Sequence, residues 1–383
     1  MRILFGSWPA YGHLFPMVPL IRAAQRGDHD VVVSSGSDMA PLLGQLGVTG
    51  HRSGVTLAES YARMPDQLTI SELPAEEQPG FAARHLFGAG AVDRARDILD
   101  LVRTWRPDLI VHDTLELGSP TAAAAHGIPH VTHGYGPMVP NTRYFAAAIG
   151  AAVSEADLPD PIPGVFAAPY IDICPPGLSG EEPYPWTAIS LLRPSPGEVD
   201  PDADVGLDFS ELPHADTVYL TLGTIMNQRP AVFRAVIDGC ARWPVNVIVT
   251  TGPGFEPSGL GALPPAVRAV PFIPQAAVLP HCRAVVSHAG AGTMLGALCH
   301  GLPQLCLPQG TDQPSNTAAL LPTGAALGLE PEETTADAVA EALGRLLNEP
   351  SFARAANRLR AEIDQMPSAD AVLAELLGGL NRR

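Results

Sequence analysis

Several segments of this 383-residue chain carry residue types that bind anions or move protons. The first, His288-Ala289-Gly290-Ala291-Gly292-Thr293, directly follows a short apolar run at 284–287. Its small residues let a ligand approach the backbone, and a helix that begins at a glycine turn presents free N–H groups to an anion, typically a phosphate. We therefore expect a strand over 284–287, a helix over 294–299 and a second strand over 304–307. His288 would then lie at the carboxyl end of a strand, where open α/β sheets bind ligands.

The glycine spacing in this segment, Gly290-x-Gly292-x-x-x-Gly296, is a loose relative of the dinucleotide-binding fingerprint, and Asp312 follows twenty residues after Gly292. Taken alone, the spacing is a weak signal, because a tight strand-to-helix turn that binds no ligand can have it too. The histidine before the glycines and the Asp312-Gln313 pair after the next strand favour a ligand site. Another candidate contact for a phosphate is Gly223-Thr224, which ends an expected strand over 217–224.

His13 and Asp113 form the second candidate group, because each lies toward the carboxyl end of an expected strand. His13 comes after the strand over 3–7, and Asp113 is the last residue of the strand over 106–113. A histidine titrates near neutral pH, so His13 is the best candidate for a general base. Asp113 would accept the other ring N–H of His13 and fix its tautomer. Two plainer readings stay open: a buried or helix-capping His13, and Asp113 as a helix N-cap. His112 should point to the opposite face of its strand, in a structural role.

The order of expected elements predicts two α/β domains. A first βαβ unit comprises a strand over 3–7, a helix over 17–25 and a strand over 31–34, and the pattern restarts at residue 217. We expect an N-terminal Rossmann-like domain over 1–193, a linker over 194–214 and a C-terminal Rossmann-like domain over 215–366. Residues 367–383 would form a last helix. A helix over 81–87 and a loop over 133–138 would lie near the ligand edge of the first sheet.

Composition excludes several classes of protein. All 23 basic residues are arginine, so a lysine-dependent P-loop and a lysine Schiff base are excluded. The net charge of −17 and the lack of a basic cluster argue against a nucleic-acid partner. We expect no membrane span and no signal peptide. The five scattered cysteines form no C-x-x-C or metal-ligand pattern, so we expect no metal and a cytoplasmic location.

The segments 272–275, 288–293 and 312–313, together with Tyr11-Gly12-His13-x-x-Pro16, resemble the nucleotide-sugar glycosyltransferases of the GT-B fold, in particular bacterial natural-product glycosyltransferases. The resemblance extends over nearly the whole chain. It implies two Rossmann-like domains that face each other across a cleft, with the helix over 367–383 packing back on the N-terminal domain. It also implies His13 and Asp113 as catalytic residues. The donor-binding residues it implies are Gly223, Thr224, Phe272, Ile273, Gln275, His288, Gly290, Gly292, Thr293, Asp312 and Gln313, with Phe272 stacking on the nucleobase.

The resemblance implies inverting transfer of a hexose from a nucleoside-diphosphate sugar, which is a co-substrate rather than a cofactor. Related enzymes that use UDP-sugars often carry a glutamate eight residues after the signature histidine, where this chain has Gly296. That glutamate grips ribose hydroxyls, so a nucleotide with 2′-deoxyribose loses little from its absence. We therefore expect a dTDP-sugar as the donor and a deoxyhexose as the group transferred. We expect a hydrophobic small-molecule acceptor, such as a polyketide aglycone, with Trp8, Phe81, Tyr135 and Met138 as its walls.

Two other functions stay open from the sequence. One is a nucleotide-sugar epimerase or an NAD-dependent enzyme on a similar double sheet, although the glycine-rich turn lies in the second half of the chain rather than in the first βαβ unit. The other is a non-catalytic helper of a partner transferase, against which the presence of both His13 and Asp113 argues. A homodimer is left open.

Overall fold

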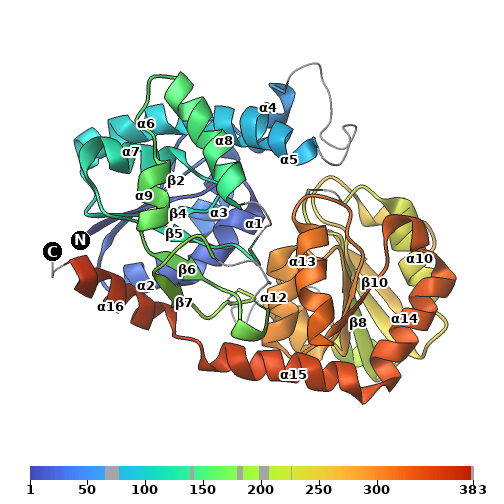
Figure 1. The fold of residues 1–383 in the computed structure, drawn as a ribbon. Coiled ribbons are helices and arrows are strands. Elements are labelled where there is room, and N and C mark those ends of the chain that lie inside the picture. The colour runs from blue at the N-terminus through green and yellow to red at the C-terminus, as the bar shows by residue number, and fades with distance from the viewer. Residues whose placement is uncertain (65–76, 139–141, 179–183, 198–206, 226, 381–383) are drawn as a thin grey trace. The chain divides into compact units, whose positions relative to one another are not determined.

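The computed structural model describes the chain except residues 65–76, 139–141, 179–183, 198–206, 226 and 381–383 (Figure 1). It divides into two compact units. The first comprises Met1–Ile173, Glu181–Leu192 and Pro367–Arg383, and the second comprises Cys174–Gly180 and Arg193–Met366. The predicted linker, 194–214, falls in the second unit and partly on residues outside the described ranges. Residues 174–180 also belong to the second unit, although the sequence places them in the first domain.

The first unit is built on a parallel sheet whose strands run in the order β3-β2-β1-β4-β5-β6-β7 among the described residues. Residues 3–5 of β1 and 109–111 of β4 are fully buried, as expected for strands that are covered on both faces. The strands are β1 (Arg2–Gly6), β2 (Asp30–Ser35), β3 (Thr49–Arg52), β4 (Leu109–Asp113), β5 (His130–His133), β6 (Tyr170–Asp172) and β7 (Ile189–Leu191).

The helices of this unit have recognisable ends. The turn after α7 is left-handed at Gly127, where φ is 64°, a conformation that glycine adopts without strain. Thr56 caps α4 through a capping box with Glu59. The helices are α1 (Tyr11–Leu14), α2 (Val18–Arg26), α3 (Ala40–Gln45), α4 (Leu57–Ala62), α5 (Gln78–Phe81), α6 (Ala89–Trp105), α7 (Gly118–His126), α8 (Thr142–Glu155), α9 (Ile162–Ala167) and α16 (Ala369–Leu380).

The second unit repeats the same plan, with the strand order β10-β9-β8-β11-β12-β13 in the part that the structure describes. Its core joins buried side chains of these strands to α10 and α14. The strands are β8 (Asp216–Thr221), β9 (Val245–Thr250), β10 (Val267–Val270), β11 (Ala284–Ser287), β12 (Gln304–Cys306) and β13 (Ala326–Gly328). The helices are α10 (Pro230–Cys240), α11 (Gln275–Val278), α12 (Ala291–Cys299), α13 (Gln313–Leu320), α14 (Ala336–Asn348) and α15 (Pro350–Gln365).

Both sheets therefore have the doubly wound, Rossmann-like order, and the predicted fold class is confirmed in this respect. In each sheet the strand order reverses beside the first strand, between β1 and β4 and between β8 and β11. His13 follows β1 and Asp113 ends β4, whereas Gly223 follows β8 and His288 follows β11. Since open α/β sheets bind ligands where the order reverses, each unit carries its candidate groups at the expected place.

Some predicted elements differ from the observed ones. The expected helix over 81–87 is the end of α5 followed by a π-helical segment, Ala82–Gly88, that continues directly into α6. Short elements α3, β3 and α4 fall between residues 40 and 62, where polar residues conceal the periodicity. A one-turn helix, α1, begins at Tyr11, between the expected strand over 3–7 and the expected helix over 17–25. π-Helical segments occur frequently at functional sites, and the segment 82–88 lies in the region that we expect to be near the acceptor.

The last helix, α16, belongs to the first unit, although α15 just before it belongs to the second. It lies beside α2 (Figure 1), where Arg26 makes three charge-assisted hydrogen bonds with Asp370, at 2.9, 3.0 and 3.3 Å. Val372 and Leu373 of α16 are buried. The apolar contact is the main stabilising interaction, because an ion pair exposed on both sides contributes at most about 1 kcal/mol.

Candidate functional site

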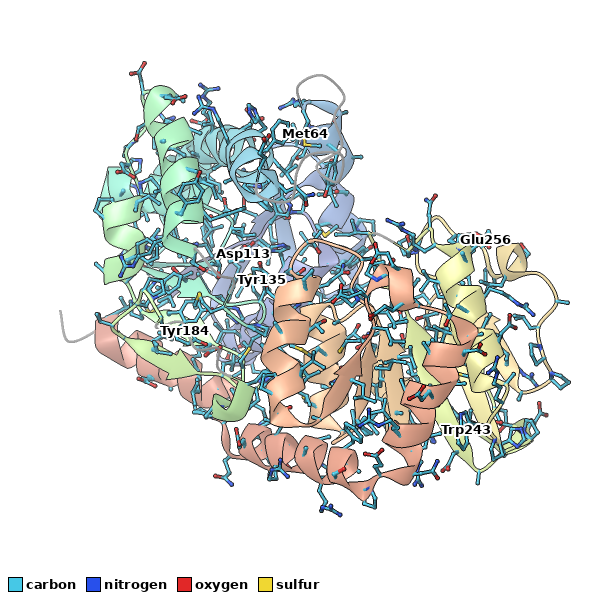
Figure 2. The ribbon with its side chains drawn as sticks, turned by 45° about the vertical axis from the view of Figure 1, so that its right-hand side comes forward. Met64, Asp113, Tyr135, Tyr184, Trp243 and Glu256 are labelled. Atoms are coloured by element: carbon cyan, nitrogen blue, oxygen red, sulfur yellow. The ribbon has the colours of Figure 1, made fainter. Side chains whose placement is uncertain are left out.

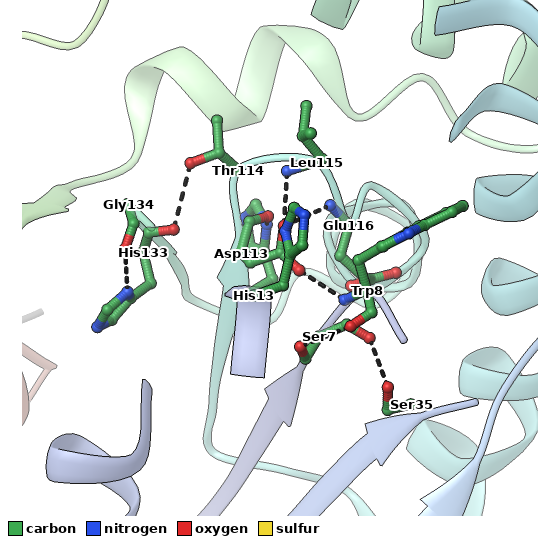
Figure 3. A network of polar contacts seen from close by, with 11 residues as sticks. Ser7, Trp8, His13, Ser35, Asp113, Thr114, Leu115, Glu116, His133 and Gly134 are labelled. Carbon is green, nitrogen blue, oxygen red and sulfur yellow. Dashed lines mark hydrogen bonds and ion pairs between the residues drawn. The ribbon is translucent and has the colours of Figure 1, made fainter. Parts of the chain in front are cut away.

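The structure brings His13 and Asp113 together from positions one hundred residues apart in the sequence (Figure 3). His13 lies in the one-turn helix α1 directly after β1, and Asp113 is the last residue of the neighbouring strand β4. His13 Nδ1 lies 3.2 Å from Asp113 Oδ1. The His13 side chain is 14% exposed, whereas Asp113 is fully buried. This hydrogen bond occupies Nδ1, so Nε2 is the ring nitrogen left to act on a ligand.

Asp113 is held as a carboxylate by three backbone N–H groups besides His13. Its Oδ2 accepts from Trp8 at 2.6 Å, and its Oδ1 accepts from Leu115 at 2.8 Å and Glu116 at 3.2 Å. Burial raises the pKa of the Asp113 carboxyl, but the neighbouring His13 and these hydrogen bonds outweigh burial, and the pKa lies below its ordinary value. Both readings of Asp113 are therefore compatible with the geometry, because it caps the turn after β4 and also contacts the histidine.

A second aromatic ring supports His13 from another loop. The Tyr135 ring lies with its centroid 4.5 Å from that of His13, and it follows β5, the strand next to β4. Asp113 and Tyr135 occupy the same region of the first unit in Figure 2. Tyr135, predicted as an acceptor wall, thus restricts the orientation of the imidazole. Met138, three residues later, is half-buried and packs against the apolar cluster around Ile149, with its sulfur 3.1 Å from Thr142 Oγ1.

Trp8, another predicted wall residue, lies in the interior and is only 2% exposed. Its ring centroid is 4.7 Å from that of Phe87 in the π-helical segment, and the fully buried guanidinium of Arg94 lies 4.3 Å over the indole. The Trp8 side chain therefore supports the site from the protein interior. Its backbone N–H donates to Asp113 (Figure 3). Phe81, the fourth predicted wall residue, is half-buried with its ring 4.6 Å from His85.

Sequence reasoning missed an aromatic pair beside the base. Tyr11 and Phe15 stack with centroids 5.5 Å apart on the same turn as His13, and Phe15 is 43% exposed. An exposed aromatic ring next to a general base can hold an apolar ligand. Sequence reasoning also missed Glu116, a buried carboxyl that accepts from the backbone N–H groups of Gly118 and Ser119 at the start of α7. Burial raises the pKa of Glu116.

His288 of the second unit lies between two glycines. A Cβ atom at Gly223 or at Gly290 would lie 2.5 or 2.4 Å from His288 Nε2, so neither position can carry a larger residue while the ring stays in place. Gly223 also has φ of +78°. Burial lowers the pKa of His288 to about 4, against a smaller opposing effect of Asp312. The ring is therefore neutral at pH 7 and can donate an N–H without carrying a charge.

The N-terminus of α12 is open at Gly292. Gly290 is its N-cap, and a Cβ at Gly292 would meet no heavy atom within 4 Å. Thr293 is buried, and its hydroxyl accepts from Gln275 Nε2 at 2.8 Å, so two predicted donor residues are in direct contact. A nine-residue helix with an exposed glycine in its first turn presents unpaired backbone N–H groups to an anion.

The loop that carries Asp312 is held by side chains of α13. Gln313, predicted to contact the sugar, is buried, and its Oε1 accepts from the Gln309 N–H at 2.7 Å. Asp312 is half-buried and accepts from the Asn316 side chain at 2.8 Å. Sequence reasoning missed Asn316, although its position four residues after Asp312 is a recognisable signal for such a contact.

The remaining predicted donor residues differ in exposure. Phe272 is 64% exposed, an unusual state for a phenylalanine that suits a stacking platform. Ile273 is buried, so only its backbone is available for contacts. Thr224 is exposed directly after β8. Across the described ranges, no three His, Cys, Asp or Glu side chains form a group able to hold a metal ion, and no helix there has the length and apolarity to cross a membrane.

The buried histidines of the first unit predict loss of stability in acid. Burial lowers the pKa of His112 to about 3, assisted by His130, and the pKa of His133 to about 4. Between pH 6.5 and 4 the unfolded chain binds protons at these positions and the folded chain does not, so the free energy of unfolding falls as the pH is lowered. Each histidine contributes on the order of a few kcal/mol. Urea unfolding at pH 7.5 and 5 measures this loss, and His133→Gln should reduce it. Equal stability at the two pH values would contradict the assignment.

Two family profiles cover most of the chain. Residues 22–189 match the N-terminal domain, and residues 234–378 the C-terminal domain, of the erythromycin biosynthesis protein CIII-like family. The chain is 31% identical to the L-demethylnoviosyl transferase of Streptomyces niveus, over all of this chain and 99% of that protein. It is 32% identical to the elloramycin glycosyltransferase ElmGT of Streptomyces olivaceus, over 98% of this chain and 97% of that protein.

A solved structure agrees with the sequence relatives. The glycosyltransferase VinC in complex with dTDP superimposes with a TM-score of 0.76, at 28% identity and with complete coverage of both chains. Fold, length and both sequence halves thus lead to the same group of proteins, and the resemblance seen in the sequence is confirmed. The chain belongs to the erythromycin biosynthesis protein CIII-like family of bacterial antibiotic glycosyltransferases and is a glycosyltransferase.

Proposed function

We propose that this enzyme transfers a deoxyhexose from a dTDP-sugar to a hydroxyl group of a polyketide-type aglycone, in a single displacement that inverts the anomeric carbon. The observation that carries the mechanism is the hydrogen bond between His13 Nδ1 and Asp113 Oδ1. An ionised Asp113 accepts from Nδ1–H, which leaves the lone pair on Nε2. Nε2 then removes the proton of the acceptor hydroxyl as its oxygen attacks the sugar, and Asp113 stabilises the imidazolium that forms.

The leaving dTDP requires stabilisation of its diphosphate. We assign this role to the α12 N-terminus at Gly292-Thr293, to the Thr224 hydroxyl and to the neutral imidazole of His288. The helix terminus and the hydrogen-bond donors act on the charge that develops as the glycosidic bond breaks. Phe272 would stack on the base, and Asp312 would accept hydrogen bonds from sugar hydroxyls. Gln313 would act mainly by holding the Asp312 loop, because its Oε1 is already used by Gln309.

The surroundings of Gly296 support a 2′-deoxynucleotide. A Cβ there would lie 3.0 Å from Gln275 Oε1 and 3.4 Å from Leu279 Cδ1, so this space already holds an amide and an apolar side chain. A carboxylate that grips ribose hydroxyls does not fit without displacing Gln275. The dTDP bound to VinC agrees with this proposal. Saturation of the site by UDP-glucose and by no dTDP-sugar would reverse the assignment.

For the acceptor we propose an aromatic or macrocyclic aglycone that contacts apolar side chains on the His13 side of the first unit. The candidates are Phe15, which is exposed, and Tyr135, Met138 and Phe81, which are half-buried, whereas Trp8 is buried and supports the site from the interior. The enzyme would act in the cytoplasm, in agreement with the cysteine pattern of the sequence. Family membership removes the support for an epimerase or an NAD-dependent enzyme, and the His13–Asp113 contact argues against a non-catalytic helper.

The variant Gly292→Ala tests the donor site with little risk to the fold. The added methyl meets no protein atom within 4 Å, and alanine is favoured over glycine in a helix by roughly 0.5–1 kcal/mol. We therefore expect unchanged or slightly higher thermal stability. If the diphosphate contacts this turn, the methyl group occupies its place, and the affinity for dTDP should fall at least tenfold, or about 1.4 kcal/mol. Calorimetric titration with dTDP measures the change.

Gly44→Ala is the matched control, since Gly44 is exposed in α3 and its added methyl also meets no atom within 4 Å. The control should gain the same helix stability and keep full dTDP affinity. Equal dTDP affinity of Gly292→Ala and the wild type would show that the donor diphosphate binds elsewhere.

A further inference from the structure

The backbone directly after His288 adopts a conformation that is disfavoured for its residue type. Ala289 has φ of +61°, in the left-handed region, and its side chain is fully buried. A residue with a Cβ persists there only when its surroundings hold it, and such residues cluster at functional sites. The conformation of Ala289 sets the direction of the chain between His288 and Gly290, the N-cap of α12. The turn that presents the proposed donor groups is thus strained and must be held in place.

Two buried side chains hold this turn from either side. The Ala289 N–H donates to Ser287 Oγ at 3.1 Å, and the Ala289 carbonyl accepts from Asn316 Nδ2 at 3.0 Å. Ser287 is fully buried at the end of β11, and Asn316 is 1% exposed in the first turn of α13. Both polar groups of the Ala289 residue are therefore bonded to side chains rather than to a helix or a strand.

The same Asn316 amide also holds the loop on the other side. Its second N–H donates to Asp312 Oδ2 at 2.8 Å, while the Asn316 backbone N–H donates to the Asp312 carbonyl at 2.9 Å. The other carboxylate oxygen of Asp312 accepts from Thr311 Oγ1 at 3.0 Å. A single NH₂ group therefore connects the strained turn after His288 to the carboxylate proposed to bind the sugar.

We propose that Asn316 is a positioning residue that holds the His288 turn and the Asp312 side chain in the mutual arrangement that the nucleotide sugar requires. In this role Asn316 does not contact the donor itself. It acts through its hydrogen bonds to Ala289 and Asp312. Without it, Ala289 relaxes out of the left-handed region, which moves the His288 ring and the α12 N-terminus, and Asp312 loses its fixed orientation. This inference rests on the donor site proposed above.

Asn316→Asp tests the proposal because it keeps the shape of the side chain and replaces its donor group by an acceptor. The new carboxylate faces the Ala289 carbonyl and the Asp312 carboxylate, and both contacts become repulsive. We expect dTDP affinity to fall on the order of tenfold or more. Ser287→Ala, which removes the opposite contact of Ala289, should weaken dTDP binding in the same direction. Ser315→Ala, one residue earlier on α13, should bind dTDP as the wild type does.

A rescue experiment separates positioning from a general loss of stability. Glycine adopts the left-handed conformation without strain, so Ala289→Gly should restore several-fold of the lost dTDP affinity in an Asn316→Ala background. In the wild-type background the same change should alter the affinity by less than about threefold, since the turn is already held. Titrations are made well below the unfolding temperature of each variant. If Asn316→Ala alone does not fold, the dTDP affinity of the double variant is compared with that of Ala289→Gly.

Two results would overturn the inference: full dTDP affinity in Asn316→Asp and Ser287→Ala, or the absence of rescue by Ala289→Gly. Gly292→Ala separates this failure from failure of the donor site itself. If Gly292→Ala loses dTDP binding while the Asn316 variants keep it, the donor site stands and only the positioning role is wrong. If Gly292→Ala binds dTDP normally, the donor site is wrong and the inference falls with it.

Discussion

His13→Ala is expected to lower the turnover number by about 10²–10⁴-fold, because it removes the group that takes the acceptor proton. The His13 side chain belongs to the first unit and contacts Asp113 and Tyr135 there, so its loss leaves every contact proposed for the donor intact. The affinity for dTDP should therefore stay unchanged. Initial rates under saturating donor and acceptor, together with dTDP titration, measure the two quantities separately.

His126→Ala provides the control, since His126 is an exposed histidine at the end of α7 in the same unit. It should keep wild-type turnover. Turnover of His13→Ala equal to that of wild type would eliminate the base assignment and, with it, the proposed displacement mechanism.

Asp113→Asn is expected to reduce both activity and stability. The carboxylate accepts four hydrogen bonds at a fully buried position, and an amide must turn its NH₂ group toward at least one of those donors. The loss of stability should be on the order of 1–3 kcal/mol, the cost of leaving a buried hydrogen-bond donor unsatisfied. An amide that donates to Nδ1 also places the imidazole proton on Nε2, where it blocks base catalysis. Turnover should fall by about 10³-fold or more.

Urea unfolding and steady-state rates measure these effects on the same preparation. Asp108→Asn is the control, because Asp108 is an exposed aspartate just before β4 that accepts from the Arg2 N–H at 2.8 Å. It should lose no more than about 1 kcal/mol and keep full activity. If Asp113→Asn loses stability but retains normal turnover at a temperature where it is folded, Asp113 is only a cap for the turn after β4.

The strands and the groups that end them were predictable, and the reason is physical. A strand buried on both faces must be a short apolar run, and parallel strands placed in doubly wound order bring their carboxyl ends to one edge. His13 and Asp113 could therefore be paired across one hundred residues without any structure. The same argument placed His288 and Gly223 beside each other in the second half.

Side-chain packing between loops could not be predicted in this way. Trp8 reads equally well as a wall or as an interior residue, and the outcome depends on Phe87 and Arg94, which reach it from a segment about eighty residues away. The Asn316 amide has partners in two loops. Its contact with Asp312 has the helical spacing of four residues, but its contact with the Ala289 carbonyl joins positions 27 residues apart and leaves no pattern in the sequence. The π-helical segment 82–88 was read as an ordinary helix because the two differ by hydrogen-bond register and not by composition.

The place of α16 has a consequence for how the chain is made. Helix α2, whose Arg26 binds the Asp370 carboxylate of α16, is synthesised before the second unit, whereas α16 is synthesised after it. The first unit therefore lacks one of its helices until the second unit has been synthesised and can fold. Folding of the first unit is completed only after the second unit has been made, so the order of synthesis separates two segments that pack together in the finished protein.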